Sequence, residues 1–98
     1  MKVDGRVEFR GQIVAEGSWQ ISVRPGSQWR ARLSGLEEPP AGVEPVFEAI
    51  LSEGQKLHLV FWVEGSAPLE ATLSEMGGKK TGFYIEVEGH NWPPAVIE

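Results

Sequence analysis

Hydrophobic and polar residues alternate along much of this chain, and the segment WRARL (29–33) shows the pattern most clearly. Its apolar residues would point to one side of an extended chain and its two arginines to the other, as in a β-strand with one buried and one solvated face. The segment WQISVR (19–24) follows the same period of two. We therefore predict strands over 19–24 and 28–34, with Trp19 and Trp29 in the core.

A short phrase of the form apolar-x-Ala-x-Leu-Ser occurs three times. The middle copy is ambiguous, because the apolar residues of 43–51 also fall at helical spacing and Gly54 could end such a helix. The other two copies alternate like strands, so we favour a strand over 45–51 and keep a short helix at 45–53 as the alternative. The three copies are WRARLSG (29–35), FEAILSE (47–53) and LEATLSE (69–75).

Extending this interpretation along the chain predicts an all-β protein of about seven antiparallel strands, mostly connected as hairpins. Short strands with a turn about every ten residues are typical of a small barrel or sandwich, whereas a helix at 45–53 would favour an OB-like barrel. Residues 47–65 also resemble 69–89, which predicts an internal repeat of two related hairpins. The predicted strands are 6–16, 19–24, 28–34, 45–51, 55–64, 68–74 and 81–88.

The remaining segments fit a single domain over residues 1–98, which is an ordinary domain length. The polar, Pro- and Gly-rich segment GLEEPPAGVE (35–44) is the predicted crossover loop between two parts of the sheet. The segment HNWPPAVIE (90–98) is the predicted C-terminal tail. Its two prolines block a helix, so we expect it to run extended over the barrel or onto a partner.

The predicted register gathers arginines on one polar face of the first strands. Four guanidinium groups on one face would suit an anionic partner, because each offers forked hydrogen-bond donors. The alternative is a solvated face that is neutralised by Glu37, Glu38 or Glu44. The predicted cross-strand pairs are Arg10 with Arg24, Ser22 with Arg30, and Gln20 with Arg32.

Two further tryptophans are candidate binding residues. Trp62 lies on an apolar strand, but alignment of the two predicted hairpins matches it to Glu86, which indicates a solvent-facing position. An outward Trp must be covered by the chain itself or serve as a contact anchor, and both interpretations stay open. Trp92 lies in the apolar tail and completes the set of candidate partner-binding residues with Trp62 and the four arginines.

Charge is divided unevenly between the two parts of this acidic protein. Residues 1–35 carry net +3 and residues 36–98 carry net −8, which gives the overall −5. Such a division favours either an electrostatically selected partner or attraction between the two parts. The scarcity of Asn, Asp and Cys beside abundant Glu, Arg and Pro is consistent with a thermophilic source or with high genomic GC content.

Catalytic and metal-binding patterns are missing from the sequence. There is no Cys, which excludes a disulfide framework and thiolate ligands. His58 and His90 have no convincing Ser partner, and Glu48–His58 is expected to be a surface cross-strand pair. Residues 77–80 (GGKK) lack the spacing of a phosphate-binding loop. We therefore predict that the protein is not an enzyme and has no cofactor or metal.

These features together favour a small binding or assembly module that contacts another protein or a second copy of itself. The alternative is single-stranded nucleic-acid binding by the four arginines, with Trp62 as a stacking platform. Oligosaccharide binding by Trp62 and Trp92 is a third option. The N-terminal residues carry no apolar signal segment and the longest apolar run (59–63) is too short to cross a membrane, so we expect a cytoplasmic location.

Overall fold

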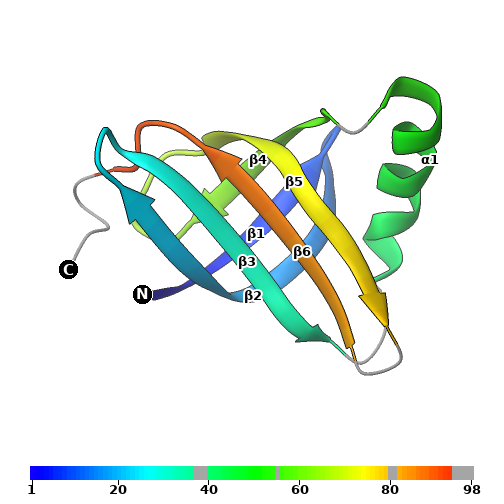
Figure 1. Cartoon of the computed structure of the whole chain (residues 1–98), viewed down its shortest axis with the longest axis horizontal. Coiled ribbons are helices and arrows are strands. Elements are labelled where there is room, and N and C mark those ends of the chain that lie inside the picture. The colour runs from blue at the N-terminus through cyan, green and yellow to red at the C-terminus, as the bar shows by residue number, and fades with distance from the viewer. Residues whose placement is uncertain (37–39, 55, 80–81, 94–98) are drawn as a thin grey trace.

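A computed structural model describes residues 1–36, 40–54, 56–79 and 82–93 of the chain. Within these residues, six antiparallel strands close into a barrel in the order β1-β2-β3-β6-β5-β4 (Figure 1). The 3-10 turn η1 (Ala41–Val43) and the helix α1 (Glu44–Glu53) connect β3 to β4. The strands are β1 (Lys2–Phe9), β2 (Gln12–Arg24), β3 (Gln28–Leu36), β4 (His58–Val63), β5 (Leu69–Lys79) and β6 (Gly82–Gly89).

The prediction of an all-β protein built as a small barrel is confirmed, with six strands in place of about seven. A helix between the third and fourth strands was the mark of the OB-like alternative. That fold, however, is a partly open barrel of five strands, whereas six strands close this one. No helix in the described part of the chain is long and apolar enough to cross a membrane.

The strand predicted over 45–51 is wrong, because α1 occupies these residues. Val46 and Ala49 are three residues apart and both are buried, so the segment follows the helical period. Pro45 stands in the first turn, where its missing N–H removes no helical hydrogen bond. Gly54 has a φ of 92°, and its N–H donates to the carbonyl of Ile50, which ends the helix. The middle copy of the repeated phrase therefore shares residue types with the other two copies but follows the period of a helix, not that of a strand.

The hairpin predicted over 47–65 is wrong for the same reason, whereas β5 and β6 form the hairpin over 69–89. The predicted first strand, 6–16, is also divided in two. Arg10 and Gly11 both have positive φ, 51° and 83°, and form the two-residue turn between β1 and β2. The break predicted between the strands 6–16 and 19–24 is absent, because β2 runs continuously through it.

The register between β2 and β3 agrees with the prediction. Ser22 pairs with Arg30 and Gln20 pairs with Arg32. The predicted pairing of Arg10 with Arg24 is wrong, because Arg10 lies in the turn before β2 and Arg24 is its last residue. This pair failed because the turn that precedes β2 was misplaced in the prediction.

A column of aromatic side chains fills the barrel. Trp19 and Trp29 are buried, as predicted. Phe61 lies between them, and its ring centroid is 5.3 Å from each of the two indoles. Trp92 extends the column, with its indole 5.5 Å from that of Trp29. The interior is therefore occupied by side chains, and any binding surface of this domain is expected on its outside.

The two ends of the barrel are covered by different segments. Helix α1 lies at one end, and the last described residues lie at the other (Figure 1). The Trp92 N–H donates to the carbonyl of Ser27 at 3.0 Å, and Trp29 Nε1 donates to the carbonyl of His90 at 3.1 Å. These two bonds attach the beginning of the predicted tail to the barrel. Residues 94–98 of that tail, and 37–39 of the predicted crossover loop, lie outside the described residues.

Candidate functional site

The four arginines that were predicted to share one face do not form a single surface. Arg30 and Arg32 lie on β3 directly opposite Glu88 and Glu86 of β6. The nitrogen–oxygen distances within these two ion pairs are 3.4 Å and 3.8 Å. Within the described residues the neutralising carboxylates come from β6, whereas Glu44 forms no ion pair. Glu37 and Glu38, the other acids of the solvated-face interpretation, lie outside the described residues. These two ion pairs therefore neutralise part of the uneven charge of the sequence within the molecule.

The other two arginines lie at different places. Arg10 is in the β1–β2 turn, where its guanidinium donates to both carboxylate oxygens of Glu53 on α1, at 2.7 Å and 2.5 Å. Arg24 is exposed at the end of β2 and pairs across the sheet with Gln28. Only Arg24 and Arg30 of the predicted set therefore contribute to one surface.

A small cluster of polar groups surrounds Arg32. Its guanidinium lies over the ring of Tyr84, 4.3 Å from the centroid. The Tyr84 hydroxyl donates a hydrogen bond to Glu75, and this bond is the main reason that the pKa of Tyr84 is raised above 10.0. Glu86 accepts a further hydrogen bond from Ser74 at 3.3 Å. Arg32 is therefore engaged by both Glu86 and Tyr84.

Neither candidate tryptophan is a free contact anchor. Trp62 faces outward as predicted but is only half-exposed, because the Arg6 guanidinium lies over its ring at 4.8 Å. Its cover within the described residues therefore includes Arg6 of β1. Trp92 is only 2% exposed and belongs to the core. Its predicted role as a partner-binding residue is wrong, because His90 and Trp92 are hydrogen-bonded to the barrel end and the indole is buried there.

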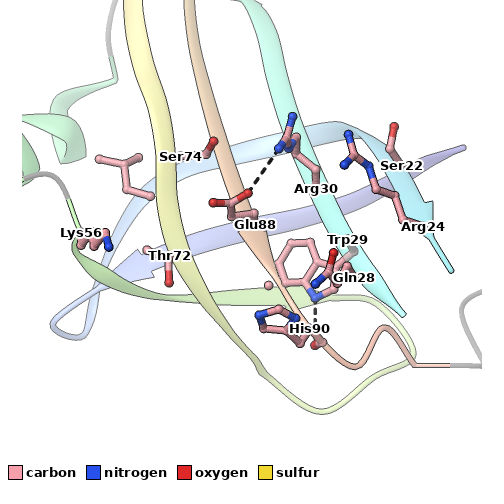
Figure 2. Close-up of a pocket in the computed structure, with 12 residues that line it drawn as sticks. Ser22, Arg24, Gln28, Trp29, Arg30, Lys56, Thr72, Ser74, Glu88 and His90 are labelled. Carbon is pink, nitrogen blue, oxygen red and sulfur yellow. Dashed lines mark hydrogen bonds and ion pairs between the residues drawn. The ribbon is translucent and has the colours of Figure 1, made fainter. Parts of the chain in front are cut away.

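A shallow groove of about 640 Å³ lies on the outer face of the sheet. Figure 2 shows its side chains, which come from β2, β3, β5 and β6, from Lys56 two residues before β4, and from His90 directly after β6. Arg24 and Lys56 stand on opposite sides of the site, and Thr72 lies between them. We call this surface the cationic groove. Its charged residues are Arg24, Arg30, Lys56 and Glu88, beside the imidazole of His90.

A second surface lies on the outward side of α1. Glu44, Phe47, Glu48 and Leu51 are spaced i, i+3, i+4 and i+7, so they form one stripe along the helix. All four are exposed, Phe47 by 41% and Leu51 by 88%. The ring of Phe47 also touches that of Phe83, with centroids 6.4 Å apart. We call this stripe the helix patch.

Sequence reasoning missed both the helix patch and Lys56. The signal for the patch was present, because the apolar residues of 43–51 extend around too much of a helical circumference for all of them to be buried. Lys56 carried no local signal. The expected pair of Glu48 with His58 is wrong, since Glu48 lies on α1 and His58 pairs with Thr72 of β5.

In the described part of the chain, no group of three or more His, Cys, Asp or Glu side chains could hold a metal ion. Comparison with known proteins found no matching family model, no similar curated protein and no similar solved structure. Function must therefore be argued from the two surfaces themselves.

Proposed function

We propose that this protein is a non-catalytic module that binds another protein through the helix patch. The observation that carries the proposal is Leu51, which is 88% exposed on a domain whose other Leu residues are buried or half-buried. Full burial of a Leu or Phe side chain contributes about 1.5–3 kcal/mol. Leu51 and Phe47 lie one helical turn apart, so a single apolar pocket or groove of a partner could cover both.

The charge of the patch selects the kind of partner. Glu44 and Glu48 flank the two apolar side chains, and neither forms an ion pair within the described residues. A partner with Lys or Arg around an apolar contact would complement this arrangement. Two copies meeting through the same patch would instead bring four glutamates together. We therefore favour a basic protein over a second copy of this chain.

The first test is crosslinking from the patch itself. A photoreactive amino acid at position 51 should crosslink to a discrete protein in an extract of the source cells. The same group at Gln20, which is exposed on β2, is the matched control. The crosslink should weaken when Glu44 and Glu48 are both changed to Lys, because the rim charge is reversed.

The second test uses the purified partner. Leu51→Ser should raise its Kd by roughly tenfold to a hundredfold, since each 1.4 kcal/mol of lost burial is a factor of ten. Val23→Thr removes another exposed apolar group away from α1 and should change the Kd less than twofold. Equal labelling from positions 51 and 20, a crosslink between two copies of the chain, or no effect of Leu51→Ser would each contradict the proposal.

A further inference from the structure

The cationic groove is independent of the helix patch and shares no residue with it. Its centre is a row of side chains that lie opposite one another on four adjacent strands, namely Ser22, Arg30, Glu88 and Thr72. Neighbouring strands are about 4.8 Å apart, so this row spans roughly 14 Å across the sheet. Arg24 and Lys56 lie toward its two ends (Figure 2). The positive groups are therefore spread along the groove and do not converge on one point.

The groove is locally positive on a protein of net charge −5. Three cations face a single carboxylate, that of Glu88. Within the described residues, Arg24 and Lys56 form no ion pair. The Arg30–Glu88 pair is long, at 3.4 Å, and its side chains are 45% and 46% exposed. An exposed pair of this kind holds its partners weakly, so Arg30 can turn toward an incoming anion.

The other side chains that line the groove are suited to contacts with phosphate groups and not with bases. Ser22, Thr72 and Ser74 supply hydroxyl groups, which together with Arg and Lys are common donors to the phosphates of nucleic acids. Trp29 offers no platform for base stacking, because it is only 2% exposed and its Nε1 already donates to the carbonyl of His90. Contacts would therefore be made with the backbone, without selection of sequence.

An acidic peptide fits these features less well. Every strand in the described barrel has a neighbour on each side, so a peptide could not add to a free sheet edge. An acidic peptide would bind well only if the spacing of its carboxylates happened to match the spacing of the cations along the groove. A phosphodiester chain carries one charge on every nucleotide and meets this requirement by its chemistry.

We infer that the cationic groove binds the phosphodiester backbone of a single-stranded nucleic acid through Arg24, Arg30 and Lys56. Each phosphate neutralised on a single strand contributes about −0.7 to the slope of log K against log salt. Three contacts give a slope of about −2. Binding is therefore expected to be strongest at low salt and to weaken moderately as salt is added.

The experiment follows the fluorescence anisotropy of a labelled oligothymidylate of about twelve nucleotides across a series of salt concentrations. The wild-type chain should bind it saturably with a slope near −2. Changing Arg24 and Lys56 together to Gln should weaken binding and reduce the slope to about −0.7. Glu88→Gln should have the opposite effect and tighten binding, because it removes the one acid and releases Arg30.

Two controls separate this proposal from general charge effects and from the helix patch. Arg10→Gln removes one positive charge at the β1–β2 turn, outside the groove, and should leave the slope unchanged. Leu51→Ser should also leave it unchanged, so that failure of either proposal is recognised separately. No binding at low salt, no response to the groove variants, or equally tight binding of an oligoglutamate of matched charge would overturn the assignment to nucleic acid.

Discussion

Replacing Trp92 with Ala tests whether the C-terminal segment is part of the barrel core. The residue is 2% exposed, and its indole packs on Trp29. A buried Trp covers about 150–250 Å², which at about 25 cal/mol per Å² corresponds to roughly 4–6 kcal/mol. Measured Trp→Ala losses are about 3–5 kcal/mol. Trp92 lies at the end of the barrel, where the chain can adjust, so we expect a loss of about 3 kcal/mol in the free energy of unfolding.

The assay is urea unfolding followed by far-UV circular dichroism, which does not depend on the fluorophore that is removed. Two Phe variants sharpen the test. Among the described residues, Trp92 Nε1 is buried without a hydrogen-bond partner, whereas Trp29 Nε1 donates to the carbonyl of His90. An unsatisfied buried group costs about 1–3 kcal/mol. Trp92→Phe removes such a group, whereas Trp29→Phe breaks an existing hydrogen bond, so Trp92→Phe should be the milder change.

The reasoning is refuted if Trp92→Ala lowers the free energy of unfolding by less than about 1 kcal/mol, since removal of an indole from a core destabilises a protein by more than this. Equal losses for the two Phe variants would show that the hydrogen-bond argument is wrong while leaving the packing argument intact. A lower m-value for Trp92→Ala would instead show that the variant exposes less surface on unfolding, as expected if its tail were already released.

Two smaller features give further predictions. Tyr84 is the only Tyr in the chain, and its raised pKa should place the midpoint of phenolate absorbance above 10, with Glu75→Gln lowering it. The stability that accompanies this raised pKa is present below pH 10 and is lost as pH rises through the pKa of Tyr84 in the folded protein. A wild-type midpoint at or below 10 would contradict the hydrogen bond from Tyr84 to Glu75. Gly42→Ala should lower the thermal midpoint, because its Cβ would lie 2.0 Å from the carbonyl oxygen of Ile13, and overpacking typically costs about 1–3 kcal/mol. Gly77→Ala is the control, since its nearest neighbour would be 3.8 Å away, and equal losses for both would exclude the steric explanation.

The sequence predicted those parts of the fold that depend on local pattern. Alternation placed strands around 19–24 and 28–34, and the short turn between them fixed their register, so that Ser22 meets Arg30 as expected. The β1–β2 turn was missed because Arg10, a residue with a side chain, takes positive φ there. Gly17 falls in the predicted break between the strands 6–16 and 19–24, but a Cβ at this position would lie 3.1 Å from Leu33 Cδ1, so glycine serves close packing inside β2.

The failure at FEAILSE (47–53) has a different physical cause. Its apolar residues satisfy both the period of a strand and that of a helix, so local pattern cannot decide between them. The decision is tertiary, because the helical form buries Val46 and Ala49 against the barrel. The interpretation of the arginine face failed for a similar reason. Arg30 meets Glu88 only because β3 pairs with β6, a contact between distant segments that no local pattern specifies.

The exposure of Leu51 is not required by the fold. Gln, Lys and Glu have helix propensities close to that of Leu, so any of them would maintain α1 at this position. They would also avoid placing an apolar side chain in water beside Phe47. The inward residues of α1, by contrast, are needed to cover the barrel end, and Arg10 already attaches the end of the helix through Glu53. Folding therefore explains Val46 and Ala49 but leaves Leu51 without a structural reason, and recognition of a partner supplies one.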